Sequence, residues 1–352
     1  MLPLLLVIIV LGIIIEAVSL RRDPDKVELD HSMSAQSCEP GAPFSVQTVI
    51  TNKSRIPLLY LAINEVYPLA AQLPEGMISR TKYGDSHIKH ICSVNGRRRK
   101  RLALETTINK RGVYSFRTES AEFGDFLGFR EISKSVSLQN EIVIYPERHD
   151  YPDLTDALGR YCGDVASRRF LIRDPILTVG CREYTGREPM RDIHWLQSAH
   201  KGELMVREFD YTRQLSACVL LGIDGAGLPD DDELDKCCAV ARSVCETLVE
   251  RGVAVDFFTN ALLKRRSGRE VWRSKAAPGH TGGLLEGLGR VSSYACCSLE
   301  RLLEYALRES EFDAAFILIL PAGEKRSGEL VNRMRNNTNQ EVLLIQTNMP
   351  TG

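Results

Sequence analysis

The hydrophobic pattern divides the chain into an apolar N-terminus, a strand-rich stretch, a charged stretch and a region of alternating strands and helices. Residues 1–15 carry no charged side chain, Glu16 follows, and Arg21 and Arg22 come soon after. In a helix, about 20 apolar residues span the ~30 Å hydrocarbon core of a bilayer. The pattern therefore predicts a transmembrane helix over residues 1–20.

The flanking charges predict an orientation for this anchor. No Lys or Arg precedes the apolar segment, whereas Arg21 and Arg22 follow it. The positive-inside rule then places the rest of the chain in the cytoplasm. We therefore expect a single-pass protein of the cell membrane, in contact with lipid through residues 1–20. The alternative is a cleaved signal peptide, because Ala17 and Ser19 imitate a small-residue cleavage site, although a positive n-region is lacking.

Residues 21–149 are predicted to form an antiparallel β-sandwich. Partial alternation of apolar and polar residues, with β-branched and aromatic enrichment, favours strands. The strand-like segments are 26–34, 44–52, 58–67, 100–109, 113–123 and 140–146. Turn signals such as Asn95-Gly96 and Arg111-Gly112 separate them. Six or seven short strands at this spacing are typical of a sandwich, and no nucleophile–base arrangement is visible among them.

A basic run, residues 97–101, follows Asn95-Gly96. One interpretation is a solvated hairpin turn. A second is contact with anionic lipid headgroups, to which each basic residue near the surface contributes about 1 kcal/mol. Nucleic acid is a third and weaker candidate, because no aromatic residues are interleaved for base stacking.

Residues 216–352 read as an α/β domain. Continuous apolar strands are expected at 217–224, 253–260, 314–321 and 341–348, and helices at 231–252, 284–291, 298–310 and 327–337. Uninterrupted Val, Ile and Leu runs between helices favour a parallel sheet covered on both faces. The prediction is a doubly wound fold.

Composition narrows the function without naming it. The 352 residues include 45 Lys and Arg against 46 Asp and Glu, a formal net charge of −1. This balance argues against a general nucleic-acid binder, so no nucleic-acid partner is expected. The ten cysteines show no CxxC pair and no zinc spacing. We interpret them as small apolar residues in a reducing compartment.

Folds of this kind bind ligands at the carboxyl ends of their parallel strands. At these positions the chain has few residues that could bind a nucleotide or a metal or act in catalysis. Residues 222–228 place a proline and then several acids where a nucleotide fold needs a glycine-rich helix start. His194 and His280 are isolated and more typical of structural or exposed histidines. The oxygen ligands are too few for a dedicated Mg²⁺ site. No cofactor is expected.

The charged stretch, residues 150–215, contains motifs that resemble a known family. It carries Arg182-Glu183-Tyr184, then Arg191-Asp192-Ile193-His194-Trp195, then a Gly202 to Glu208 ending that includes Leu204, Val206 and Arg207. This order and spacing resemble the family called domain of unknown function 58. Upstream pieces, such as Arg111-Gly112-Val113-Tyr114 and Phe126-Leu127-Gly128-Phe129, are similar to the family's strand and turn.

The chain also departs from the family pattern. Thr185-Gly186-Arg187-Glu188 replaces a common Arg-Pro-Gly-Asp, His194 replaces a common Asp, and Leu196 a common Lys. These departures put a shared charge network in doubt at His194 and Leu196.

The resemblance implies a C-terminal domain similar to von Willebrand factor type A. Where that superfamily binds a metal, this chain has Asp224, Ala226 and Leu228, and Thr281 matches a second loop. Ala226 and Leu228 offer no side-chain oxygen, and residues 321–323 supply no Asp on the third loop, so the metal site is expected to be degenerate. The resemblance also implies partnership with a MoxR-type AAA+ ATPase.

These observations predict a membrane-anchored, non-enzymatic interaction or adaptor protein. Its interaction residues are those of the signature: Arg182, Glu183, Tyr184, Arg191, Ile193, Trp195, Leu204, Val206, Arg207 and Glu208. We further expect the charged members to form a partly buried network around Trp195, because isolated charges beside a buried ring are costly. The alternative function is a metal-assisted hydrolase on the α/β domain.

Overall fold

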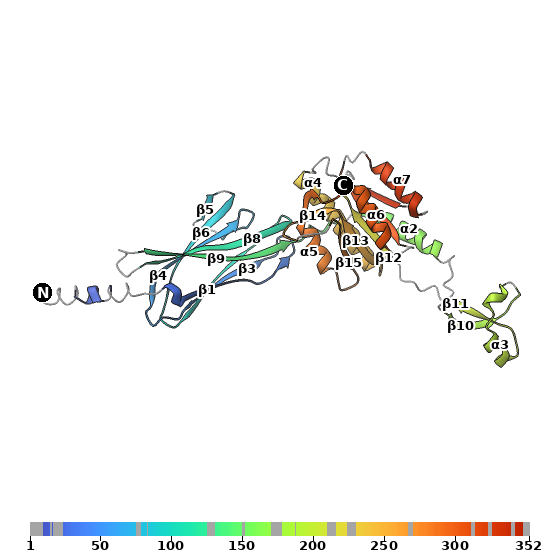
Figure 1. Cartoon of the computed structure of the whole chain (residues 1–352), viewed down its shortest axis with the longest axis horizontal. Helices are drawn as coiled ribbons and strands as arrows, with labels where there is room; N and C mark the ends of the chain where they lie inside the picture. The colour runs from blue at the N-terminus through green and yellow to red at the C-terminus, as the bar shows by residue number, and fades with distance from the viewer. Residues whose placement is uncertain are drawn as a thin grey trace. The chain divides into compact units, whose positions relative to one another are not determined.

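The computed structural model describes residues 10–14, 16, 24–74, 79–82, 84–124, 131–149, 152–169, 178–186, 188–209, 216–223, 230–266, 270–310, 314–322, 326–338 and 342–347. The chain forms two compact units (Figure 1). The first comprises residues 1–147 with 288–290, and the second comprises 148–287 with 291–352.

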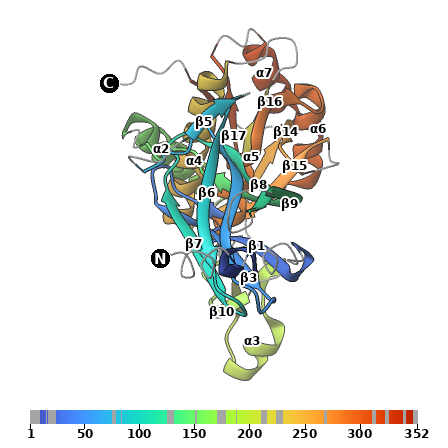
Figure 2. The ribbon, with the colours of Figure 1, turned by 90° about the vertical axis from the view of Figure 1, so that its left-hand side faces the viewer.

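Two sheets build the first unit. Its strands are β1 (Val27–Met33), β2 (Ser37–Cys38), β3 (Phe44–Asn52), β4 (Leu58–Pro68), β5 (Ser79–Lys82), β6 (Asp85–Val94), β7 (Arg99–Thr106), β8 (Gly112–Gly124) and β9 (Glu131–Ile144). One sheet has the order β1-β3-β7, whose strands are labelled in Figure 2, and the other has the order β2-β9-β8-β4-β6-β5. All pairings are antiparallel except β2 with β9. A short 3₁₀ turn, η1 (Pro24–Lys26), precedes β1.

Alternating side chains of both sheets fill the space between them. One apolar cluster includes Phe44 and Phe116, whose rings meet edge to face with centroids 5.7 Å apart. A second cluster includes Ile50, Leu61 and Ile63. Period-2 alternation thus places every second residue of β3 in the interior.

A polar layer divides these two clusters. Along β4, Ile63 belongs to one cluster and Tyr67 to the other, and the buried Glu65 lies between them. Glu65 accepts hydrogen bonds from Thr48 Oγ1 (2.5 Å) and the Tyr67 hydroxyl (2.9 Å), and its Oε2 lies 3.2 Å from His90 Nε2. Burial acts to raise the pKa of Glu65, but the hydrogen bonds from His90, Thr48 and Tyr67 outweigh it and hold the pKa below its usual range.

His31 and Asn140 extend this layer. His31 pairs with Thr48 in the register of β1 and β3. The Asn140 amide donates to the His31 carbonyl oxygen (2.6 Å) and lies 3.0 Å from His31 Nδ1. Burial lowers the pKa of His31, against the opposing charges of Glu65 and Asp30. The neutral ring is therefore the form that the fold favours.

The second unit contains a mixed five-stranded sheet of order β15-β13-β12-β17-β18. Its strands are β12 (Ser216–Leu221), β13 (Ala254–Thr259), β15 (Trp272–Ala276), β17 (Ala315–Leu320) and β18 (Val342–Gln346). Neighbours are parallel except for the edge strand β15, which is antiparallel to β13. A separate small sheet pairs β14 (Ala261–Leu263) with β16 (Val291–Ala295).

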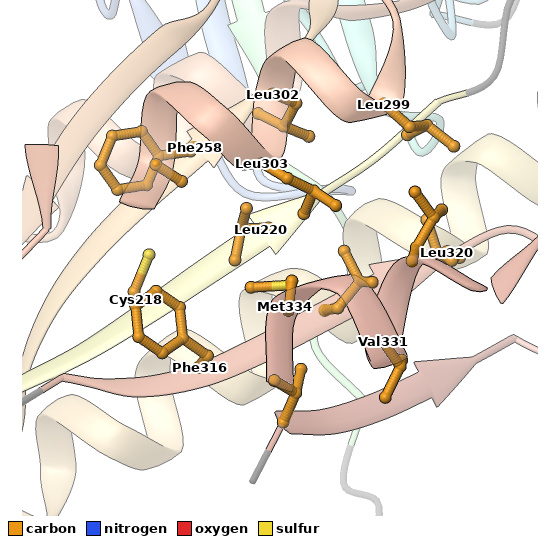
Figure 3. Packing of buried hydrophobic residues seen from close by; sticks show 14 of the residues in the cluster. Cys218, Leu220, Phe258, Leu299, Leu302, Leu303, Phe316, Leu320, Val331 and Met334 are labelled. Carbon is orange, nitrogen blue, oxygen red and sulfur yellow. The ribbon is translucent and has the colours of Figure 1, made fainter. Parts of the chain in front are cut away.

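Helices pack against the mixed sheet. They are α2 (Pro152–Arg169), α4 (Asp231–Glu250), α5 (Gly282–Arg290), α6 (Leu299–Glu309) and α7 (Ser327–Thr338). Figure 3 shows leucines of α6, with Met334 and Val331 of α7, packed on Cys218 and Leu220 of β12. Helix α4 contacts β12, β13 and β17 of this sheet, and α2 contacts α4. The Tyr161 hydroxyl of α2 bonds the backbone of Phe316 at 3.1 Å.

The fold class predicted from the sequence is wrong in two respects. The first concerns the doubly wound parallel sheet. The observed sheet is mixed, because residues 272–276, which show no apolar run, form an antiparallel edge strand. Residues 291–295, the expected end of a helix and the loop after it, form the strand β16 of another sheet. Strands dominate the described chain, and nothing in it supports a von Willebrand A-like domain.

The second error concerns the membrane. Within the ranges that the structure describes, no helix combines the length and apolar character needed to cross a bilayer. Residues 10–14 and 16 are helical, whereas residues 1–9, 15 and 17–20 of the expected anchor lie outside the described residues. This finding contradicts the predicted transmembrane helix over residues 1–20. It equally contradicts the predicted single-pass location at the cell membrane.

Candidate docking site

The family-like motifs fold into a small module, defined here as residues 178–209 and called the signature module. It contains β10 (Thr178–Glu183), η2 (Met190–Asp192), α3 (Trp195–Lys201) and β11 (Met205–Phe209). The strands β10 and β11 pair antiparallel, and α3 packs beside them (Figure 1). The module belongs to the second unit.

Backbone and capping hydrogen bonds fix α3 to the antiparallel pair of strands β10 and β11. His194 Nδ1 accepts from the Gln197 amide (3.2 Å) and so caps the start of α3. The His194 amide donates to the Met205 carbonyl (2.8 Å), and the Met205 amide donates to Ser198 Oγ (2.8 Å). Gly202, with φ +76°, ends the helix in the left-handed conformation that glycine adopts without strain. His194, which is isolated in the sequence, is therefore a structural residue that caps α3.

Three buried residues form the apolar interior of the signature module. Ile193, Met205 and Val206 are each 2% exposed, and Ile193 forms a β-bridge with Val206. Trp195 does not take part, because its residue surface is 62% exposed. Of the signature residues, only Ile193 and Val206 are buried among those whose side chains the structure describes. The side chain of Glu208 lies outside the described residues.

Large apolar side chains gather on the surface around α3. Met190 is 66% exposed, Leu196 71% and Leu204 44%, beside the 62% of Trp195. All four lie in α3 or in the turns that flank it. Exposed Trp, Met and Leu side chains gathered within one short stretch of chain are of the kind that occurs at protein interaction sites.

Among the side chains that the structure describes, the predicted partly buried charge network around Trp195 does not form. Arg182 pairs with Glu188, its Nη2 2.7 Å from Glu188 Oε1, and its Nη1 donates to the Glu183 carbonyl oxygen (3.4 Å). The Arg191 side chain is 85% exposed, with its Nε 3.8 Å from Asp192 Oδ1. The prediction of buried pairs is wrong, because the ring that was to be buried is itself exposed.

Glu188 is a site residue that the sequence analysis missed. It accepts from the Thr185 hydroxyl (2.8 Å) and the Thr185 amide (3.1 Å) in addition to Arg182. The Thr185 and Arg182 bonds lower the pKa of Glu188 to about 2. A signal existed, because Glu188 stands where the family pattern Arg-Pro-Gly-Asp also ends in an acid. The salt link therefore closes the turn after β10.

The expected degenerate metal site remains a prediction, because most of its residues lie outside the described structure. Asp224, Ala226 and Leu228 lie outside the described residues. Thr281 precedes α5, where its carbonyl accepts from the Leu285 amide. Among the described side chains, no group of three His, Cys, Asp or Glu is placed to hold a metal ion.

Comparison with known proteins gives a distant sequence relative whose name carries no function. No family model matches the chain. The chain is 21% identical over 225 residues to a protein of Bacillus subtilis (strain 168) named "Uncharacterized protein YeaD", which covers 64% of this chain and 54% of that protein. The chain thus matches about half the length of this relative. The name assigns no function.

Solved structures give only weak likenesses. A cohesin module from the Clostridium perfringens family 33 glycoside hydrolase matches 34% of this chain and 96% of its own, with 15% identity and a TM-score of 0.26. A type II cohesin domain from the Acetivibrio cellulolyticus cellulosome matches 33% and 95%, with 10% identity and a TM-score of 0.26. At these scores neither likeness carries a conclusion.

Proposed function

We propose that this chain is a non-enzymatic interaction protein that docks a partner through the signature module. The observation that carries the proposal is the exposure of Trp195 together with Met190, Leu196 and Leu204. The module holds its shape without these four side chains, because Ile193, Met205 and Val206 form its interior. Surface positions that the fold does not need are available for binding.

The proposed partner is a MoxR-type AAA+ ATPase. This choice rests on the resemblance of residues 182–208 to the domain of unknown function 58 family, and the exposed patch is consistent with it. Trp and Arg are the residue types that most often dominate binding energy at protein interfaces. Here Trp195 and Arg191 are both exposed and lie four residues apart in the chain. We expect the indole to enter an apolar pocket of the ATPase.

The test compares Trp195→Ala with Ile193→Ala in the full chain. Trp195→Ala is expected to leave the melting temperature within about 1–2 °C, since an exposed substitution changes stability by no more than about 0.5 kcal/mol. Binding to a purified MoxR-type ATPase from the same organism, measured by biolayer interferometry, is expected to weaken at least tenfold. Ile193→Ala is expected to lower the melting temperature of the module, because it removes a buried side chain.

Two kinds of outcome would contradict the proposed docking site. Unchanged ATPase binding in Trp195→Ala, or no binding by the unaltered chain, rejects this docking site. A large loss of thermal stability in Trp195→Ala also counts against the proposal, because it shows that the indole supports the fold. Glu203→Ala, an exposed change in the same module, serves as the matched control.

A further inference from the structure

Two loops at one end of the first unit are tied together by a buried asparagine. Asn52, 1% exposed, donates through Nδ2 to the carbonyl oxygens of Ile56 (3.0 Å) and Asn95 (3.3 Å). Its Oδ1 accepts from the Ser54 amide (3.0 Å), and its own amide donates to the Arg98 carbonyl (3.0 Å). Loop 53–57 and turn 95–98 therefore form one ordered tip.

The two loops approach each other closely. A Cβ at Gly96 would lie 2.1 Å from the Arg55 carbonyl oxygen, so only glycine fits there. The next residue, Arg97, has φ +55°, a left-handed conformation that L-residues rarely adopt because it brings Cβ close to the following carbonyl oxygen. The Arg97 amide donates to the Ser54 carbonyl (2.8 Å) across the junction. The tip thus holds an arginine in a strained position where glycine or asparagine is usual.

The tip is strongly basic, and most of its charged side chains have no acidic partner within the described chain. Lys53, Arg55 and residues 97–101 contribute seven positive charges, five of them arginines. Within the described chain, Lys53 pairs with Glu28, but no carboxylate lies within ion-pair distance of Arg55, Arg97, Arg98, Arg99 or Arg101. Many exposed arginines elsewhere are paired, such as Arg333 with Glu304 at 3.0 Å.

The basic run continues into a strand that forms the edge of a sheet. Strand β7 is the last strand of the β1-β3-β7 sheet. Because the Asn52 amide bonds the Arg98 carbonyl, the antiparallel pattern turns the backbone groups of Arg99, Arg101 and Ala103 away from β3. No described strand pairs with β7 on that side. Charged residues on an edge also protect it from indiscriminate pairing, which is the alternative explanation of the basic run.

We propose that the edge of β7 and the basic tip bind an extended acidic segment of a partner protein. The segment adds as a strand to β7, so that main-chain hydrogen bonds hold it and its carboxylates meet the guanidinium groups of Arg97, Arg99 and Arg101. Arginine favours carboxylates because its planar fork makes two parallel hydrogen bonds. Glu105, exposed at the far end of β7, limits the acidic contact to residues 97–101.

Nucleic acid fits this surface less well. Residues 53–57 and 95–101 contain no aromatic side chain on which a base could stack. The free backbone groups of an edge strand also offer a polypeptide more than they offer a phosphate chain. The surface lies in the first unit, whereas the signature module belongs to the second, so this proposal stands apart from the ATPase docking site.

The test uses the full chain and a fluorescein-labelled ten-residue peptide of alternating Glu and Val. Anisotropy is expected to show saturable binding that weakens as salt increases. The double variant Arg99→Glu/Arg101→Glu is expected to weaken binding at least tenfold. The charge-matched control Lys275→Glu/Arg335→Glu, at exposed positions of the second unit, is expected to leave it within twofold.

A second variant separates strand addition from simple charge attraction. Ala103→Pro removes an amide that faces the free edge and leaves every charge in place, and proline is tolerated on edge strands. Binding is expected to fall at least fivefold while the circular dichroism spectrum is unchanged. If Ala103→Pro unfolds the chain, N-methylation of alternate peptide amides tests the same bonds from the other side.

Several outcomes would overturn the proposal. They are unaltered peptide binding in the arginine variant, equal binding of a Lys-Val peptide, and full binding by both the proline variant and the N-methylated peptide. Tighter binding of a 20-base-pair DNA duplex or of phosphatidylserine vesicles through the same arginines would assign the surface to those ligands instead.

Discussion

At the residue scale, the buried polar layer of the first unit makes the fold sensitive to pH. The pKa of His31 lies below its ordinary value of about 6.5, because burial disfavours the charged ring. A group with a depressed pKa in the folded state binds its proton first in the unfolded state. His31 therefore costs stability as the pH falls below about 6.5 and through the lower folded pKa.

We expect protection of β1 and β3 against hydrogen exchange to fall between pH 7 and pH 5.5, after correction for intrinsic exchange rates. His31→Gln removes the titrating ring, so the decline should disappear. His280→Gln, at an exposed position of the second unit, is the matched control and should retain the decline. An equal pH dependence with and without His31 would show that another group carries it.

Glu65 adds a second, more acidic transition. Its folded pKa is also depressed, despite burial, because His90, Thr48 and Tyr67 donate to the carboxylate. Its contribution to the stability of the fold is fully present above the ordinary glutamate pKa of about 4.3. This contribution is lost as the pH falls through the lower pKa of the folded state. The two groups thus act in the same direction over different ranges of pH.

At the element scale, strands with regular alternation could be predicted and irregular elements could not. β3 covers the expected segment, since its burial alternates without interruption. β6 was missed because its inward positions include the polar Ser86 and His90. α2 was missed because Gly159, Gly163 and several charged residues obscure its periodicity. Tertiary contacts, rather than local pattern, decide these elements.

The structure of the signature module could likewise be predicted only in part from the sequence. A tryptophan within a motif suggests burial, yet the interior of the signature module is filled by Ile193, Met205 and Val206. The pattern predicted neither this small interior nor the turn closed by Glu188. Which apolar residues remain outside a module depends on how many its interior can hold, and that number is set by packing.

Helix α5 carries a prediction at the same scale. A Cβ at Gly287 would lie 1.9 Å from Trp272 Cη2, so Gly287→Ala forces the helix away from β15. We expect a loss of roughly 1–3 kcal/mol in the free energy of unfolding, the usual range for overpacking. Thermal denaturation of the full chain measures it. Gly283→Ala on the same helix meets nothing within 4 Å and should leave the melting temperature unchanged or slightly higher.

At the scale of the whole molecule, the two proposed surfaces belong to different compact units. The β7 edge with its basic tip is in the first unit, and the signature module is in the second. Sites that share no residues or contacts usually contribute additively. The chain would then hold two independent docking sites, one for an acidic strand and one for an apolar pocket.

The prediction that follows combines the two sets of variants. Trp195→Ala should leave binding of the Glu-Val peptide unchanged, and Arg99→Glu/Arg101→Glu should leave binding of the ATPase unchanged. In the combined variant, each affinity should fall by the same factor as in the corresponding single variant, within about 0.3–0.5 kcal/mol. Anisotropy and interferometry on the same preparations measure both. A larger deviation would contradict independence and show that the two surfaces are energetically coupled, as they would be if both served one partner.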